Sequence, residues 1–383
     1  MKFGGNMEIK RIVVTGGPGA GKTSVLRELQ KRFVSNGKTK YYFVSESATE
    51  IINSGIDPQK INSIYNFQDI IYDWQEVKEN VIDKSLTFDT DFSEVVIFYD
   101  RGILDNGAYF NTRDEFDLLL KNKQAKELEL LDKYDLVLDL IGTANGNEKA
   151  YNLESNPARY ESIDRSKELD INTSRSWIGH RHFKSFNCNM SLEQKINNVI
   201  NYVEGYIKGQ TTAEMKRYLV DTDNSVLDSY NDENSVCIDV TENYIDVGSD
   251  FKNLEMVLTK RTYKGNSTYF LSLIERTSNT LRYISDSKIS KQQYDEMLKK
   301  YLISDIVQKK EISFMQDRQS FHLNLYQDFT TLELEENKDN EKLVIPDNIK
   351  IIKSLSDIEE LKQMERYGYD YFNNKQYKKV KKN

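Results

Sequence analysis

The sequence predicts an α/β protein in which a doubly wound parallel sheet is followed by a separate antiparallel β domain of α+β type. Over the first 210 residues, short apolar strands alternate with amphipathic helices, which is typical of a parallel sheet with helices on both faces. Beyond residue 236, strand-like segments follow one another with tight turns between them, as in an antiparallel meander. The 383 residues are enough for two such domains.

The elements of the first domain follow from apolar runs and helical periodicity. The run over 94–100 ends in an acid, as expected of a central strand buried on both faces. The expected helices carry apolar residues at a period of 3.6, and Asn36-Gly37 ends the first of them. We expect strands at 11–15, 40–45, 94–100, 135–141 and 179–187, and helices at 22–33, 59–86, 113–132 and 191–208.

The second domain is expected to be an antiparallel meander with one helix. Lys264-Gly265-Asn266 and Asp317-Arg318-Gln319 are expected turns. A helix is expected over 290–301, where Ser290 and Gln293 have capping-box spacing. We expect strands at 236–246, 254–263, 267–276, 306–315, 320–328, 331–336 and 343–352.

Changes in composition predict the domain boundaries. The first domain is expected over 1–210, and a polar, turn-rich stretch predicts a linker over 211–235. The second domain then covers 236–370, and the lysine-rich residues 371–383 are expected to form a disordered basic tail.

The composition restricts the class of protein. A formal net charge of -8 argues against a nucleic-acid-binding protein, because binding a phosphate backbone needs a basic surface. Cys188 and Cys237 are too few and too separate for a disulfide framework or a zinc site. No apolar run approaches the roughly 18 residues of a membrane-spanning helix, and the first ten residues lack the apolar segment of a secretion signal. We therefore expect a cytoplasmic, reducing location.

A glycine-rich motif predicts a nucleotide site. Residues Gly16 to Thr23 (GGPGAGKT) match the P-loop pattern G-x-x-x-x-G-K-[ST] between an apolar strand and an amphipathic helix. Glycines let backbone N–H groups approach phosphate oxygens, and the helix starting at Lys22 adds its positive dipole end. Lys22 is expected to reach the β- and γ-phosphates, and the Thr23 hydroxyl to bind Mg²⁺. The candidate nucleotide contacts are Gly16, Gly17, Pro18, Gly19, Ala20, Gly21, Lys22, Thr23 and Ser24. The expected ligand is ATP or GTP with Mg²⁺, and no guanine-reading N-K-x-D motif chooses between them.

An acid and an arginine end the most apolar strand. Asp100 stands where a second Mg²⁺ ligand is expected, with a turn or capping acid as the alternative. Arg101 and Gly102 follow, and Asp105 completes the pattern Asp-Arg-Gly-x-x-Asp. An arginine at this position can hold a phosphate or an acceptor with its planar fork, which suits phosphoryl transfer to a small molecule.

Two further charged features are candidates for the same site. Glu46 follows the second strand, so its carboxylate can accept a proton from an acceptor hydroxyl or hold the acceptor, or else it is an exposed or capping acid. Arg159, Arg165 and Arg175 lie in a polar segment after the fourth strand, which is either an arginine-bearing lid or an ordinary exposed loop. Arg159 is the strongest lid candidate.

Residues 11–205 resemble the P-loop family that contains the nicotinamide riboside kinases of the NadR type. The resemblance rests on VTGGPGAGKTS, SESATEII, FYDRGILD and NPARYESIDRSKELD. It implies a kinase-like domain, in which the catalytic candidates are Lys22, Glu46, Asp100, Arg101 and Arg159.

Residues 236–365 resemble the CYTH family, whose fold is that of the triphosphate tunnel enzymes. The matching pieces include LTKRTYKGNSTYFLSLIERT, SKQQYDEML and KKEISFMQDRQSFHLNLYQD. The pairing of the two domains is similar to an insect family that binds nucleotide and phosphoinositide. The second domain departs from the hydrolase pattern, because only Glu242 of an E-x-E-x-K motif and Arg261 of an R-x-R-x-R motif are present. The expected K-x-R motif reads Lys309-Lys310-Glu311.

The altered motifs allow two interpretations of the second domain. The charged residues that could line a polar tunnel are Arg261, Arg276, Lys309, Glu333 and Glu335. We expect no complete triphosphatase site. A reduced tunnel for a phosphorylated small molecule or an anionic lipid headgroup stays open beside a structural or partner-binding barrel.

Two classes of function are therefore expected for the whole chain. In one, the first domain hydrolyses a nucleoside triphosphate or transfers its γ-phosphoryl group to a small hydroxyl acceptor. In the other, the protein is a nucleotide-regulated adaptor without kinase activity. Its second domain and lysine tail would then bind an anionic ligand or make peripheral contact with a membrane.

Overall fold

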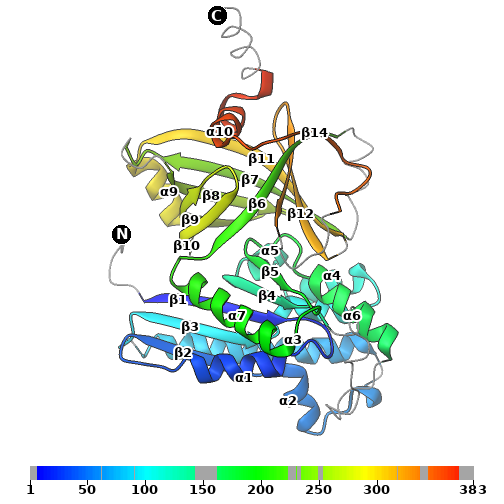
Figure 1. Cartoon of the computed structure of the whole chain (residues 1–383). Coiled ribbons are helices and arrows are strands. Elements are labelled where there is room, and N and C mark those ends of the chain that lie inside the picture. The colour runs from blue at the N-terminus through cyan, green and yellow to red at the C-terminus, as the bar shows by residue number, and fades with distance from the viewer. Residues whose placement is uncertain are drawn as a thin grey trace, which may run out of the picture. The chain divides into compact units, whose positions relative to one another are not determined.

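The chain folds into two compact units, Met1–Val203 and Glu204–Asn383 (Figure 1). The structure is a computed structural model that describes residues 7–61, 63–89, 91–142, 162–222, 230, 234–248, 253–316, 318–336 and 344–370. Among these residues, no helix combines the length and the apolar character needed to cross a membrane.

The first unit is a parallel sheet with helices on both faces. Its strands are β1 (Glu8–Thr15), β2 (Thr39–Val44), β3 (Glu94–Asp100), β4 (Leu136–Leu140) and β5 (Phe183–Phe186). They lie in the order β2-β3-β1-β4-β5, and every pairing is parallel. The middle of β3 and the end of β1 are fully buried, as the apolar runs predict. The predicted doubly wound fold is confirmed.

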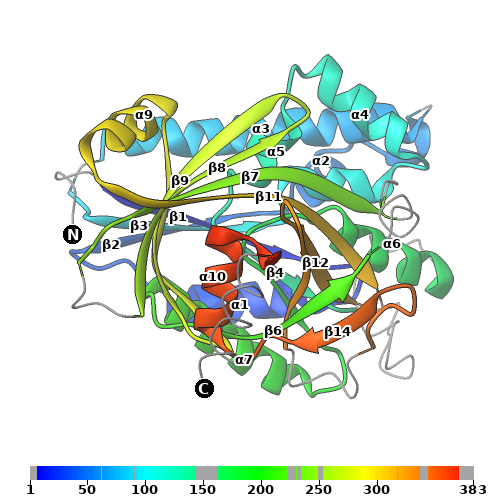
Figure 2. The same cartoon turned by 90° about the horizontal axis from the view of Figure 1, so that it is seen from above.

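Helices cover the two faces of this sheet. They are α1 (Lys22–Arg32), α2 (Ser47–Asn53), η1 (Pro58–Lys60), α3 (Ile64–Leu86), η2 (Ile103–Tyr109), α4 (Arg113–Asn122), α5 (Glu127–Leu131), α6 (Ile163–Arg175) and α7 (Leu192–Ile207). The helices α1 and α7 lie on one face, and α3 lies on the other (Figures 1 and 2). The chain order reverses beside β1, and ligands bind outside the carboxyl ends of strands at such a point.

Two helix predictions in this unit need correction. The helix expected over 113–132 is two helices, because Gln124 has a φ of 54° and breaks the ladder between α4 and α5. Half of the segment expected to be a polar lid is the helix α6, whose buried face consists largely of small polar side chains. Ser162 caps α6 by accepting a hydrogen bond from Arg165 N. A search for apolar periodicity misses a helix with such a buried face.

The second unit is an antiparallel sheet that closes on itself. Its elements are β6 (Thr212–Asp221), β7 (Ser235–Ile245), β8 (Leu254–Tyr263), β9 (Asn266–Arg276), β10 (Thr280–Ile289), α9 (Lys291–Lys300), β11 (Ile303–Gln316), β12 (Gln319–Leu325), β13 (Thr330–Glu335), β14 (Lys350–Ser354) and α10 (Ile358–Tyr367). The strand order is β10-β9-β8-β7-β11-β12-β13-β6-β14, and β10 also pairs with β6. This last pairing closes the sheet into a barrel, so the predicted antiparallel fold is confirmed. Ser290 and Gln293 form the predicted capping box of α9.

Three assignments in the second unit are corrected. Residues 212–221, expected to lie in a linker, form β6. One of its buried positions is Arg217, so the sequence of this strand lacks an apolar pattern. The strand expected over 343–352 begins only at Lys350, because Pro346 has no N–H for a ladder and accepts a turn hydrogen bond from Ile349 N. The strand β10 is mostly half-exposed and was not expected.

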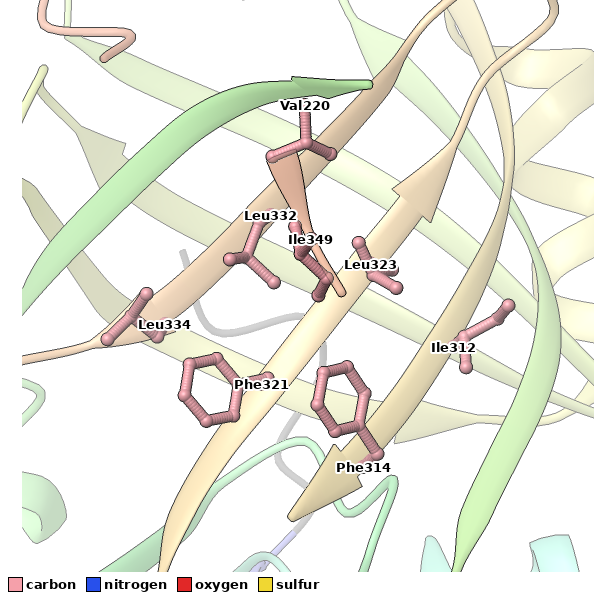
Figure 3. Close-up of a cluster of buried hydrophobic side chains, with 8 residues drawn as sticks. All are labelled: Val220, Ile312, Phe314, Phe321, Leu323, Leu332, Leu334 and Ile349. Atoms are coloured by element: carbon pink, nitrogen blue, oxygen red, sulfur yellow. The ribbon is translucent and has the colours of Figure 1, made fainter. Parts of the chain in front are cut away.

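An apolar cluster holds one side of the barrel wall together. Phe314 and Phe321 stack with ring centroids 5.3 Å apart, and Phe321 is completely buried. The cluster consists of Val220, Ile312, Phe314, Phe321, Leu323, Leu332, Leu334 and Ile349 (Figure 3). Burial of each such side chain contributes about 1.5–3 kcal/mol. Because side chains alternate along a strand, the residues between these positions point into the barrel.

Candidate functional site

The carboxyl ends of the central strands bring the predicted phosphate site together. In the parallel register Val14 lies opposite Asp100, and Val44 lies opposite Tyr99. The residues that follow β1, β2 and β3 therefore start from the same edge of the sheet. They are the glycine-rich loop, Glu46 and Arg101.

The loop between β1 and α1 needs its glycines. Gly16, Gly19 and Gly21 have φ angles of 131°, 75° and 92°, in the region that side chains disfavour. A Cβ on Gly16 would lie 2.1 Å from the carbonyl oxygen of Leu140. No side chain of the described residues caps the start of α1 at Lys22, so its first N–H groups can donate hydrogen bonds to an anion. Thr23 and Ser24 lie in this first turn.

Lys22 folds back over the loop. Its Nζ donates to the carbonyl oxygens of Gly16 at 2.9 Å and Gly17 at 3.1 Å. Burial, and then the positive charge of the nearby Arg101, lower the pKa of Lys22 to about 8. A bound phosphate would offset both effects, because it supplies the opposite charge.

Asp100 has an oxygen with no partner among the described residues. Its Oδ1 is buried and receives no hydrogen bond. Burial, and then the carboxylate of Glu46, raise the pKa of Asp100 to about 6. A buried carboxylate oxygen without a donor, beside the hydroxyl-bearing first turn of α1, fits the oxygen ligands that Mg²⁺ prefers. Within the described part of the chain, no group of three or more His, Cys, Asp or Glu residues could hold a metal alone. Mg²⁺ would therefore need phosphate oxygens and water as further ligands.

Arg101 and Glu46 form an ion pair at this edge. Arg101 Nε donates to Glu46 Oε1 at 2.8 Å, and the guanidinium lies 5.7 Å from the ring centroid of Tyr109. Arg101 has a φ of 70°, which is unfavourable for a side chain other than glycine, so its backbone is held by its surroundings. Burial alone would raise the pKa of Glu46, but Arg101 and Lys22 together hold it well below its usual range.

Asp105 holds the strained turn in place. Its carboxylate accepts hydrogen bonds from Gly102 N at 2.7 Å, from Trp177 Nε1 at 3.2 Å and from the Thr15 hydroxyl. Asp105 is 2% exposed, and burial raises its pKa. The sequence pattern pointed to Asp105, but its role in fixing the turn is visible only in the structure.

Two of the three predicted lid arginines, Arg165 and Arg175, belong to the helix α6. Arg159 lies outside the described residues. Arg165 forms an ion pair with Glu168 at 2.8 Å within α6, and Arg175 is exposed at the end of that helix.

Charges inside the barrel are paired with one another. Arg276 binds Glu365 of α10 at 2.9 Å and Glu255 at 3.2 Å, and Figure 2 shows α10 over the barrel opening. Lys309 lies 3.6 Å from Glu242. Burial alone would lower the pKa of Lys309, yet the surrounding carboxylates raise it, Glu242 first. Among the described residues, Arg276 and Lys309 are therefore neutralised by nearby acids.

The other predicted tunnel residues belong to the same set. Glu333 lies 3.4 Å from the buried Arg217. Arg261 is 3% exposed and helps to lower the pKa of Glu311. Glu335 is half-buried at the end of β13.

A family of sequences matches the first unit. The model of a family described as an AAA domain matches residues 11–194. The matched range runs from β1 to the start of α7 and includes the glycine-rich loop, Asp100 and Arg101. This likeness indicates a P-loop nucleotide-binding domain, a class that usually binds its nucleotide with Mg²⁺. No curated protein matches the chain.

Several solved structures share a weak likeness with the chain. The PH1819 protein of Pyrococcus horikoshii OT3 is 15% identical with a TM-score of 0.26, over 34% of this chain and 81% of that protein. The PH1012 protein of the same organism is 11% identical with a TM-score of 0.26, over 33% and 80%. A conserved hypothetical protein of Pyrococcus furiosus is 14% identical with a TM-score of 0.26, over 33% and 81%. Likenesses of this strength inform neither fold nor function.

Proposed function

We propose that the first unit binds a nucleoside triphosphate with Mg²⁺ at residues 16–24 and transfers its γ-phosphoryl group to a small hydroxyl acceptor or to water. The observation that supports this proposal is a buried Asp100 oxygen with no hydrogen-bond partner among the described residues, at the same sheet edge as Lys22 and the Arg101–Glu46 pair. The resemblance to nicotinamide riboside kinases supports a small acceptor. ATP and GTP are equal candidates for the donor.

The loop and its lysine bind the phosphates in this proposal. The N–H groups at the start of α1 donate hydrogen bonds to phosphate oxygens. Lys22 gives up its hydrogen bonds to the carbonyl groups of Gly16 and Gly17 and contacts the β- and γ-phosphates instead. Thr23 and Asp100 would hold Mg²⁺, which neutralises phosphate charge when it is bound.

Arg101 and Glu46 act on the acceptor side. The low pKa of Glu46 makes it a weak base, so we assign it to holding Arg101 and the acceptor hydroxyl rather than to removing a proton. The guanidinium of Arg101 stabilises charge on the transferred group through its planar fork. Arg159 is proposed to add a further positive charge.

Turnover assays with and without an acceptor test this function. The protein with Mg²⁺ and ATP or GTP is incubated with a panel of nucleosides and ribosides, and phosphorylated product is measured over many turnovers. Lys22→Ala should abolish product, whereas Lys31→Ala, on the exposed side of α1, should not change it. The absence of any phosphorylated acceptor, together with no nucleotide hydrolysis above the Lys22→Ala level, would show that the protein is not a phosphotransferase or a nucleotidase.

A further inference from the structure

We propose that Asp170 and Lys195 are positioning residues for the phosphate-binding loop. Neither belongs to the glycine-rich motif, and both come from helices packed beside it, α6 and α7. The inference rests on the proposed nucleotide binding and adds to it the two side chains that hold the loop in a binding-competent shape.

Asp170 ties the entry of the loop to the end of β4. Its Oδ1 accepts a hydrogen bond from Gly17 N at 2.8 Å, and its carboxylate also accepts from Gly142 N at 3.1 Å. Asp170 is completely buried. One carboxylate therefore fixes two backbone segments, of which one is the start of the phosphate loop.

The approach of α6 explains a glycine that the P-loop pattern does not require. A Cβ on Gly17 would lie 2.4 Å from the Cβ of Asp170, and a Cβ on Gly142 would lie 3.2 Å from its Oδ1. Gly17 occupies one of the freely variable positions of the motif. The contact with Asp170 is the reason that this position is a glycine here.

Lys195 contacts the other end of the same loop. Its Nζ donates to Ile141 O at 2.9 Å and lies 3.5 Å from Ala20 O, the outer limit of a hydrogen bond. In a trans peptide, C=O and N–H point in opposite directions. A carbonyl oxygen of Ala20 turned toward Lys195 therefore turns the N–H of Gly21 away from Lys195, to the side open to a phosphate. Leu192, one turn earlier on α7, packs 3.1 Å from the position of a Cβ on Gly21.

Burying two charged side chains costs free energy of folding. Lys195 is 3% exposed, and burial lowers its pKa. Buried charges are retained where they make hydrogen bonds that a neutral residue cannot. Asp170 and Lys195 make those hydrogen bonds to the backbone of the loop and of residues 141–142. Both side chains are therefore assigned to holding the loop and not to contacting the phosphate.

Isosteric variants of the full chain test this inference. Asp170→Asn and Lys195→Met are compared with the wild type and with Asp164→Asn, an exposed control in the first turn of the same helix α6. The dissociation constants of Mg²⁺–ADP and of a magnesium-bound non-hydrolysable ATP analogue are measured well below the unfolding temperature of each variant. Glycine-selective ¹⁵N labelling reports the amide shifts of Gly19 and Gly21 on nucleotide addition.

The expected result is a loss of about tenfold in affinity for both nucleotides in Asp170→Asn and Lys195→Met, because each loses a charge-assisted hydrogen bond to the loop. The amide shifts of Gly19 and Gly21 should be smaller than in the wild type, and Asp164→Asn should match the wild type. Variants that melt earlier but keep the wild-type affinity and amide shifts would overturn the inference and leave only a structural role. If one variant fails to fold, the other decides. A wild type that binds no nucleotide would overturn both the proposed function and this inference.

Discussion

Asp100 and Lys22 have pKa values displaced toward neutrality, which sets a pH window for nucleotide binding. Burial raises the pKa of Asp100 to about 6 and lowers that of Lys22 to about 8. Below pH 6 Asp100 gains a proton and loses its ability to hold Mg²⁺. Above pH 8 Lys22 loses the positive charge that attracts phosphate. Between these values both groups are charged.

We expect the affinity for Mg²⁺–nucleotide to be highest between about pH 6 and pH 8 and to fall on both sides. Calorimetric titrations from pH 5 to pH 9 measure the profile. Lys22→Arg should remove the alkaline decline, because arginine stays protonated. Phosphate groups also titrate near pH 6, so the acid limb is judged by comparison with Asp100→Asn, whose affinity should be low and change less. Equal acid limbs in the two proteins would contradict a role for Asp100.

Arg101 offers a planar fork that lysine cannot replace. Arg101→Lys should lower the turnover number by about 100-fold, because it removes the paired donors to the transferred group, and it should change nucleotide affinity much less. Steady-state kinetics and nucleotide titrations measure the two effects. Arg113→Lys, on the surface helix α4, is the matched control. A turnover number within twofold of the wild type would exclude Arg101 from the reaction.

Among the elements, the turn from β3 into η2 depends on one buried acid. Asp105→Asn keeps the shape of the side chain but sets an N–H₂ group among donors from Gly102, Thr15 and Trp177. Leaving such buried donors unpaired costs about 1–3 kcal/mol. Urea denaturation should therefore show a lower free energy of unfolding for this variant, whereas the exposed Asp114→Asn should lie within about 0.5 kcal/mol of the wild type. An unchanged midpoint for Asp105→Asn would show that Asp105 does not hold the turn.

Strong apolar patterns predicted most of the elements. The strand over 94–100 was placed to the residue, because a continuous apolar run that ends in an acid marks its bounds. The helix α6 was missed because Ser166, Asp170, Thr173 and Ser174 form its buried face. Asp170 and Ser174 make hydrogen bonds to distant parts of the chain, and such partners cannot be predicted from local periodicity.

Part of the candidate site was likewise predictable from local sequence. A local motif predicts the phosphate loop, and the end of an apolar run predicts the position of Asp100. Asp170 and Lys195 had no sequence signal, because each acts on backbone groups that only the fold brings near. The closure of the barrel could not be predicted from the sequence either, because it depends on three residue pairs between β6 and β10.

For the whole molecule, the paired charges of the barrel predict a poor binding site for free phosphates. Lys309 and Arg276 already face carboxylates, and α10 supplies Glu365 from outside the strands. Tripolyphosphate and inositol phosphates should therefore bind the Lys22→Ala variant, whose nucleotide site is disabled, with dissociation constants above about 1 mM, as judged by calorimetry. Micromolar binding that is lost in Lys309→Met would contradict this expectation and favour an adaptor that senses phosphorylated ligands.

A titration of the full chain with a non-hydrolysable ATP or GTP analogue, with and without Mg²⁺, tests whether residues 16–24 form a nucleotide site. We predict that one equivalent binds, that Mg²⁺ strengthens binding in the wild type but not in Asp100→Asn, and that Lys22→Ala weakens it by about 100-fold while the surface variant Lys31→Ala does not. Binding that is absent with both analogues, or that is unaffected by Lys22→Ala, would contradict the claim that residues 16–24 form a nucleotide site.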